Sequence, residues 1–271
     1  MKMETHTQSV TAAIQSSDYA RLSVIFTSQW QSLGQGEQRT LASHFIKTSV
    51  ASPSFFPAAF KSAQIMEIIH TTLNHLPPSV ENAADNILRQ QIFDYKVNEE
   101  EDYSTAARIL SGLKMEENEE SVYYMPAIDR CDVFVKVAEC YLEEDLTVEA
   151  EGAVSKAGTI IEASGIMSKN NNNSMSSSEG ENEVIKDERT VTIILRYKST
   201  HARVLDANRK FLQAAVKYHD LSTAYLHSSS VDVDDLLVML GRAVTCAILS
   251  PNSAQRQRRV TLFCTCSRIL H

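Results

Sequence analysis

The sequence repeats one helical pattern, and this repeat constrains the fold more than any single segment does. Each copy has an apolar stripe at helical spacing, a short polar break, and a second stripe that contains alanines. The equivalent alanines Ala107, Ala150 and Ala214 lie 43 and 64 residues apart. The longer interval contains a low-complexity insertion, and without it the period is roughly 40 residues, as in stacked helical hairpins. The sequence therefore predicts an all-α fold, an α-solenoid of antiparallel helical hairpins.

The clearest copy covers residues 133–161. Its first helix carries apolar side chains at i, i+1, i+4, i+5, i+8 and i+9, and a polar break follows at residues 143–145. Thr147 is expected to cap the second helix, with Glu149 in its first turn. The small side chains of the second helix would let a neighbouring helix approach closely. Its predicted buried face consists of Ala150, Ala153, Val154, Ala157, Ile160 and Ile161.

Two further copies flank this one. The earlier copy covers residues 92–110 with a break at 99–102, and the later copy covers residues 193–218 with a break at 207–209. The later copy includes Ala214 in its second stripe. Three copies indicate that each hairpin packs mainly on its neighbours in the sequence.

Two helices are also predicted nearer the N-terminus. Apolar residues at three- and four-residue steps predict one helix that starts near Asp18 and another from Ala63 to Leu73. Pro77 and Pro78 should end the second helix, because proline lacks an amide donor and disfavours helix in the preceding residue.

The chain is expected to divide into five segments. One stretch is rich in Asn, Ser and Glu, which cannot bury apolar surface, so we expect a disordered loop there. The Thr-, Gln- and Ser-rich N-terminus is expected to fray. In order, the segments are a flexible N-terminus (1–17), a helical-repeat region (18–163), a disordered Asn/Ser-rich insertion (164–188), the continued helical-repeat region (189–263) and an aberrant tail (264–271).

The composition agrees with a helical, intracellular protein. Only 8 Gly and 6 Pro occur among 271 residues, which is few for folds that need many tight turns. No run of 18 apolar residues occurs, and the first residues lack the apolar core of a signal peptide. The cysteine count of 5 is odd and the cysteines are widely spread, so reduced thiols are expected.

The net charge of −8 is concentrated in the middle of the chain. Residues 94–151 contain 17 acidic and 5 basic side chains, whereas the rest contains 17 acidic and 21 basic ones. An acidic face repels nucleic-acid phosphates and anionic lipid, so a partner of this acidic block would be a basic protein surface. The alternative is that these charges only keep the protein soluble.

The sequence predicts no catalytic, cofactor-binding or metal-binding residue. The zinc-protease, serine-hydrolase, P-loop and dinucleotide-binding motifs are absent. The carboxylates at 99–102 and 143–145 fall at predicted turns, where solvation would keep them from acting as general acids. The spacing of His70 and His75 does not place both on one helix face, so surface or packing roles are expected.

The C-terminal stretch does not form a convincing site either. Cys264, Cys266 and His271 supply too few ligands for a structural zinc, which needs four. An arginine cluster without interleaved aromatic residues could contact phosphates, but it could equally pair with acidic groups on a neighbouring helix. This cluster consists of Arg256, Arg258 and Arg259.

Four stretches read together resemble the helical-repeat region of the COP9 signalosome subunit 4 family. These stretches are EEEDYSTAARILSGL (99–113), VAECYLEEDLTVEAEGAVSKAG (137–158), HARVLDANRKFLQAAVKYHDLS (201–222) and AVTCAILSPNSAQRQRRVTLF (243–263). The resemblance covers residues 80–263 well and residues 18–80 faintly. A proteasome-lid regulatory subunit has a similar hairpin stack and remains an alternative, as does a free-standing helical-repeat adaptor.

The resemblance implies a TPR-like, PCI-type helical protein without enzymatic activity or cofactors. It implies a scaffold subunit, in the nucleus and cytoplasm, of the complex that removes a ubiquitin-like modifier from cullin-RING ligases (deneddylation). The implied partners are the other signalosome subunits, with the cullin-RING ligase as substrate of the complex. Neither nucleic acid nor membrane is implied.

The sequence departs from the family in two places. The Asn/Ser-rich insertion stands where relatives have a short connection. After Phe263 the family continues through further helices, a winged-helix PCI module and a final long helix, whereas this sequence has CTCSRILH (264–271). We therefore expect a chain truncated before the PCI module, which contains elements that the family uses for assembly.

Overall fold

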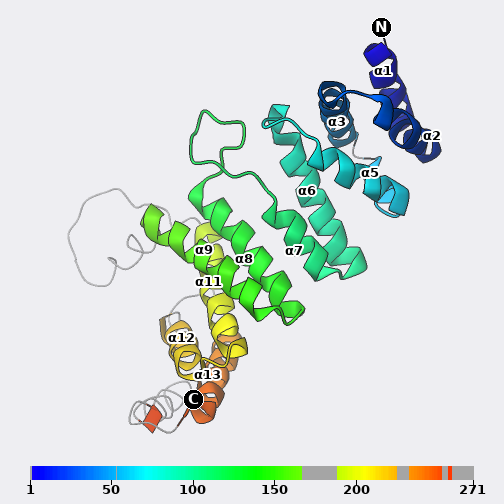
Figure 1. The fold of residues 1–271 in the computed structure, drawn as a ribbon. Coiled ribbons are helices and arrows are strands. Elements are labelled where there is room, and N and C mark those ends of the chain that lie inside the picture. Colours follow the sequence, from blue (N-terminus) through cyan, green and yellow to red (C-terminus); the bar gives the residue numbers. More distant parts are fainter. Residues whose placement is uncertain (1, 53, 167–187, 225–231, 252–255, 258–271) are drawn as a thin grey trace. The chain divides into compact units, whose positions relative to one another are not determined.

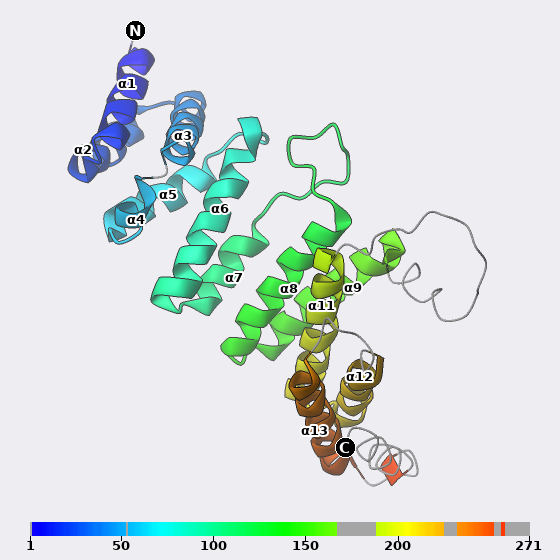
Figure 2. The ribbon, with the colours of Figure 1, turned by 180° about the vertical axis from the view of Figure 1, so that it is seen from behind.

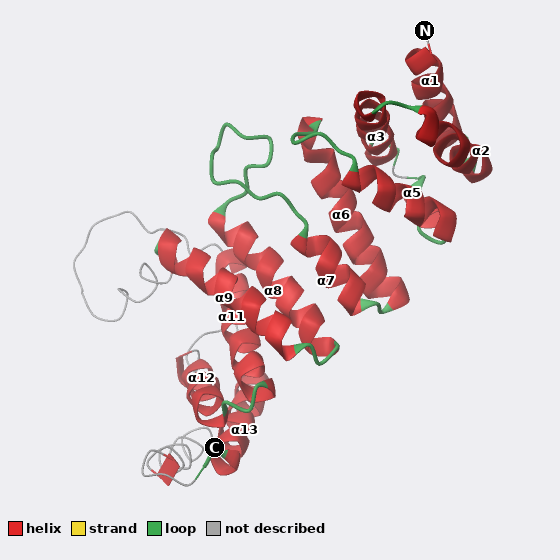
Figure 3. Ribbon diagram, in the orientation of Figure 1, coloured by secondary structure: helices red, strands yellow, loops and turns green. Residues whose placement is uncertain are grey.

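The structure is a computed structural model that describes residues 2–52, 54–166, 188–224, 232–251 and 256–257. The chain divides into two compact units, Met1–Met125 and Pro126–His271. Within the described ranges the regular elements are helices, and the one β-type interaction is an isolated bridge between Glu116 and Tyr124 (Figure 3). The predicted all-α fold class is confirmed.

The first unit is built of short helices around an aromatic core (Figure 1). Helix α3 packs against α1, α5 and α6, and α6 packs against α7. The core contains the rings of Phe26, Trp30, Phe45 and Phe55, with Phe26 and Phe45 edge to face at 5.3 Å between centroids. The elements are α1 (Lys2–Gln15), α2 (Tyr19–Val24), a π-helical turn (Ile25–Gln29), a 3-10 turn (Trp30–Ser32), α3 (Gln35–Val50), α4 (Phe56–Ala59), α5 (Ala63–Asn74), a 3-10 turn (Glu81–Ala83), α6 (Ala84–Tyr95), a π-helical turn (Lys96–Glu100) and α7 (Tyr103–Ser111).

The prediction of a flexible N-terminus at residues 1–17 is wrong. Helix α1 occupies Lys2–Gln15 and packs against α3. Three of its side chains, Val10, Ala13 and Ile14, are at most 1% exposed. They lie at i, i+3 and i+4, so a stripe of only three apolar residues is enough to bury this mostly polar helix.

Both predicted helices nearer the N-terminus are confirmed. Helix α2 begins after Asp18, whose side chain accepts a hydrogen bond of 3.0 Å from the Arg21 amide, as an N-cap does. Helix α5 spans Ala63–Asn74 and therefore ends before Pro77.

The second unit contains five described helices in hairpin order (Figure 2). Helices α8 and α9 pack on each other, α11 packs on both, α12 packs on α11, and α13 packs on α12. Short connections at 144–146 and 208–210 make α8–α9 and α11–α12 antiparallel hairpins, close to the predicted breaks. The helices are α8 (Ala127–Glu143), α9 (Thr147–Ser164), α11 (Glu188–Ala207), α12 (Phe211–Ala224) and α13 (Val233–Leu249).

The buried face of α9 matches the prediction, but its cap does not. Ala150, Ala153 and Ala157 are buried, whereas Ile160 is half-buried. The N-cap is Leu146, which makes no side-chain hydrogen bond, and Thr147 is the first helical residue. The turn is closed by the backbone instead, because the Leu146 amide donates to the Tyr141 carbonyl at 2.9 Å. A side-chain cap from Thr147 is therefore absent.

Two sequence predictions fall on parts of the chain outside the description. The disordered insertion predicted at 164–188 coincides largely with residues 167–187, and the aberrant tail at 264–271 lies within residues 258–271. Ser164 ends helix α9 and Glu188 begins helix α11.

Candidate functional site

The described residues offer no clustered ligands for a metal. Within the described ranges, no group of three or more His, Cys, Asp or Glu side chains lies close enough to hold an ion. His70 is exposed on α5, whereas His75 follows α5 and packs edge to face on Trp30 at 5.3 Å between centroids. The two histidines thus have different surroundings. In the same described ranges, no helix combines the length and apolarity needed to cross a membrane.

The buried thiols of the second unit are held in the protonated form. Burial, with the nearby charge of Asp132, raises the pKa of Cys131 to about 12. Burial, followed by the charges of Glu139 and Glu143, raises the pKa of Cys140 to about 11. Because the thiolate is the nucleophile and the metal ligand, neither group is prepared for that chemistry at neutral pH.

Several carboxylates of the acidic block have partners inside the protein, beginning with the predicted turn at 99–102. Glu100 forms an ion pair with Lys96, and Asp102 is the N-cap of α7, accepting a bond of 3.1 Å from the Thr105 amide. Burial acts to raise the pKa of Asp102, but the hydrogen bonds from Thr105 and the charges of Lys96 and Arg108 lower it overall. These two carboxylates therefore stabilise local structure, whereas Glu99 and Glu101 are exposed.

In the second unit, carboxylates of α8 pair with arginines of α11. Arg189 Nη2 lies 2.6 Å from Asp129 Oδ1, and Arg203 Nη2 lies 2.9 Å from Glu143 Oε1. The carboxylates of the turn at 143–145 are exposed, as predicted, and Glu143 also pairs with a residue of a helix 60 residues away in the sequence. We call this set, completed by the pairs of Arg196, the ion-pair ladder.

Arg196 stands at the centre of the ion-pair ladder. Its Nη1 donates to Asp132 Oδ1 at 3.0 Å, and its Nη2 donates to Glu139. Burial alone would lower the pKa of Arg196, but the hydrogen bond to Glu139 and the charges of Glu139 and Asp132 raise it overall. Further along, Lys210 and Asn208 bind the Glu151 carboxylate at 2.5 and 2.9 Å. These acids of the block are therefore not free to meet a partner.

One solvent-facing part of the block is a long ordered loop after α7 (Figure 1). A buried network, formed by Asp85, Lys114 and Tyr123, holds it to the start of α6. The Tyr123 hydroxyl donates to Asp85 Oδ1 at 3.0 Å and accepts from the Val80 amide at 2.8 Å. Lys114 Nζ lies 3.1 Å from Asp85 Oδ2. Asp85 is 1% exposed and Tyr123 is 3% exposed, so this network is an anchor inside the first unit.

Two further features order this loop. Asn86 binds the backbone of Lys114 twice, donating to its carbonyl at 2.7 Å and accepting from its amide at 3.0 Å. The Glu116 amide donates to the Tyr123 carbonyl at 3.0 Å, and the Met125 amide donates to the Glu116 carbonyl at 3.1 Å, which closes the loop at its base.

We call residues 116–124 the acidic loop. Its exposed side chains include four glutamates together with the apolar groups of Val122 and Tyr124, which are 52% and 41% exposed. A fixed surface with negative charge and apolar side chains suits a basic protein partner and offers no catalytic group. The sequence contains a signal for this loop, four glutamates within residues 116–120. In the sequence alone, these glutamates cannot be told apart from the rest of the acidic block. The glutamates are Glu116, Glu117, Glu119 and Glu120.

The lowered pKa of His201, on α11, predicts that the stability of the second unit depends on pH. Burial and the charges of Lys217 and Lys210 lower its pKa below 6.5, although Glu151 opposes this. A histidine whose pKa is lower in the folded chain takes up a proton on unfolding, so the free energy of unfolding should fall as the pH drops through 6.5. Denaturant unfolding at several pH values should show a smaller pH dependence in His201→Gln than in the wild type. His6→Gln in the other unit is the control, and equal pH dependence in the wild type and His201→Gln would contradict the prediction.

With the helical hairpins and the acidic loop described, the sequence can be compared with those of known proteins. No known family profile matches the chain. The COP9 signalosome complex subunit 4 of Arabidopsis thaliana is 29% identical over 197 residues, which are 71% of this chain and 43% of that protein. The subunit 4 of Drosophila melanogaster is 27% identical over 198 residues, covering 72% of this chain and 40% of its own length.

A shorter match has a higher percentage identity. The Caenorhabditis elegans subunit 4 is 37% identical over 70 residues, which are 26% of this chain and 16% of that protein. The chain spans less than half the length of these curated relatives. Proteins from a plant, an insect and a nematode that carry the same name thus all match this chain. On this evidence the chain is similar to the COP9 signalosome subunit 4 family across about 70% of its own length.

Proposed function

We propose that this chain acts as a non-catalytic scaffold subunit of the COP9 signalosome, in the nucleus and the cytoplasm. The observation that carries the proposal is the match of 197 residues to the Arabidopsis subunit 4, which covers 71% of this chain. Stacked hairpins present long surfaces to other proteins and need no catalytic residue. In this proposal the chain binds other signalosome subunits and contributes to the removal of a ubiquitin-like modifier from cullin-RING ligases.

Co-purification tests the proposal directly. The full chain with an affinity tag is expressed in cells of the organism that encodes it, and the recovered proteins are identified by mass spectrometry. We expect the other signalosome subunits, and the eluate should remove the modifier from a cullin substrate. Recovery of proteasome-lid subunits would favour the alternative assignment and overturn this one. Recovery of neither set would leave a free-standing adaptor as the better description.

The acidic loop supplies a more specific prediction within this proposal. Reversing the charges of Glu119 and Glu120 with lysine should reduce recovery of the partner that contacts the loop by about three- to tenfold, because the loop would then repel a basic surface. The matched control is the pair Glu67→Lys and Asp94→Lys, which changes the net charge equally at exposed positions on α5 and α6.

Quantitative mass spectrometry of the two purifications measures the difference. A decrease in one partner that is confined to the acidic-loop variant supports the prediction. Equal recovery of every partner from both variants would show that the acidic loop is not a contact surface.

A further inference from the structure

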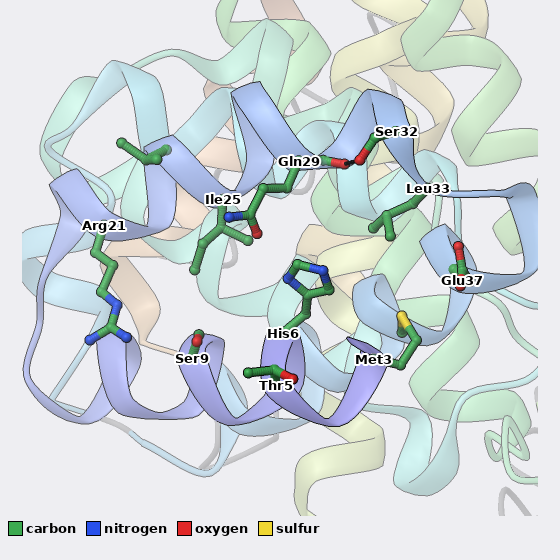
Figure 4. A pocket seen from close by; sticks show the side chains of 11 residues that line it. Met3, Thr5, His6, Ser9, Arg21, Ile25, Gln29, Ser32, Leu33 and Glu37 are labelled. Atoms are coloured by element: carbon green, nitrogen blue, oxygen red, sulfur yellow. Dashed lines mark hydrogen bonds between the residues drawn. The ribbon is translucent and has the colours of Figure 1, made fainter. Parts of the chain in front are cut away.

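The first unit contains a hollow of about 760 Å³ between α1, α2 and the start of α3 (Figure 4). This volume lies in the range of roughly 300–1,000 Å³ that is usual for ligand-binding sites. The lining is mixed, with the apolar side chains of Ile25 and Leu33 beside polar groups from α1 and from the turns after α2. All residues that line the hollow belong to the first unit, and the hollow is therefore separate from the hairpin stack of the second unit.

One buried polar atom on this hollow has no partner in the structure. The side-chain oxygen Oε1 of Gln29 is enclosed but accepts no hydrogen bond. Figure 4 shows the Gln29 side chain directed toward His6, across the hollow. An enclosed acceptor without a donor costs about 1–3 kcal/mol of stability, so the wall of the hollow is locally strained.

The two ends of the hollow carry opposite charges. In Figure 4 the Arg21 guanidinium lies at one end and the Glu37 carboxylate at the other. The Arg21 side chain has no ion pair within the described residues, whereas its backbone amide donates to the side chain of Asp18 and its carbonyl accepts from the Ile25 amide. Glu37 Oε2 accepts from the Gly34 amide at 3.0 Å, and its side chain remains exposed. Both charges are therefore accessible to a ligand.

The backbone beside the hollow is irregular. The Trp30 amide donates to the Ile25 carbonyl, which makes residues Ile25–Gln29 a π-helical turn, and a 3-10 turn follows at Trp30–Ser32. Single π-helical turns occur frequently at functional sites. Here the π-helical turn contains both Ile25 and Gln29, which line the hollow.

We propose that this hollow binds a short extended peptide segment of a partner protein, with an acidic side chain at the Arg21 end and a basic side chain at the Glu37 end. Apolar side chains of the peptide contact Leu33, which is half-buried at the wall of the hollow. The α1 residues that line the hollow, 3 to 9, span about 9 Å at 1.5 Å per residue. An extended peptide rises about 3.3 Å per residue, so two charges that span this distance lie about three residues apart in the peptide.

Three pools of fluorescein-labelled tetrapeptides test this inference on the full chain. One pool has unlike terminal charges (Glu-x-x-Lys with Lys-x-x-Glu), one has two acidic ends, and one has two basic ends. Fluorescence anisotropy should show that the wild type binds the unlike-charge pool about tenfold more tightly than either like-charge pool. Pooling both orders makes the result independent of the direction in which the peptide lies.

Charge reversal in the protein gives the decisive comparison. Arg21→Glu should transfer the preference to the pool with two basic ends. The matched control Arg39→Glu reverses an exposed arginine of α3 that does not line the hollow, so it should keep the wild-type preference.

Two outcomes overturn the inference. The first is the absence of saturable binding of any pool by the wild type up to millimolar peptide. The second is the same change of preference in Arg21→Glu and Arg39→Glu, which would attribute the effect to net charge. The inference does not rest on signalosome membership, so either outcome leaves the proposed function standing.

Discussion

Replacing Asp85 with alanine should lower the free energy of unfolding of the first unit by about 2–4 kcal/mol. The substitution leaves the Lys114 ammonium and the Tyr123 hydroxyl without their carboxylate, and removal of one partner from a buried pair costs more than removal of both. This loss of free energy is smaller than the loss expected for a fully buried ion pair, because the Lys114 side chain is 35% exposed. Asp85 also lies in the first turn of α6, where a negative charge is favourable.

The fluorescence of Trp30 provides the measurement, because the chain has 1 tryptophan and it lies in the core of the first unit. Asp94→Ala is the matched control, since Asp94 is an exposed acid on the same helix. The double variant Asp85→Ala with Lys114→Met should lose less stability than the sum of the two single variants. Hydrogen exchange should accelerate in the acidic loop of Asp85→Ala. An unfolding midpoint equal to that of the Asp94→Ala control would contradict the prediction.

Replacing Ala214 with phenylalanine should destabilise the second unit by about 1–3 kcal/mol through overpacking. Ala214 is 0% exposed and belongs to a cluster with Ala202, Ala243 and Ala247, where small side chains allow α11, α12 and α13 to approach closely. Ala150 of α9 is also 0% exposed, and Ala150→Phe should have a similar effect.

Thermal unfolding followed by circular dichroism measures both variants. The control is Ala163→Phe, which adds the same side chain at an exposed position of α9. If Ala150→Phe and Ala214→Phe both unfold at the wild-type temperature, these two alanines do not face the helix contacts described here.

The hairpins were predictable because their signal is local. Apolar side chains at helical spacing, with Ala150, Ala153 and Ala157 on one face, define α9 without knowledge of its neighbours. Helix α1 was missed for a related reason. Its polar composition concealed a stripe of only three apolar residues, and burial of Ile14 depends on a surface that α3 supplies.

The long-range contacts were not predictable from spacing. Asp85 and Tyr123 are 38 residues apart in the sequence, and Asp132 and Arg196 are 64 apart. Composition placed the acidic residues in one block, but it could not separate those that pair with α11 from those on the acidic loop. Only the packing of the helices makes that distinction. The unpartnered oxygen of Gln29 is likewise a property of the folded chain.

The ion-pair ladder also fixes how far α11 is shifted along α8. Arg189, Arg196 and Arg203 recur every seven residues and meet carboxylates of α8 in the same order, so the two helices run parallel. A displacement of α11 by one turn, about 5.4 Å, would separate every pair at once. The side chains therefore set the register of α11 independently of the number of residues between α9 and α11. That connection can lengthen or shorten during evolution while the hairpin stack keeps its alignment.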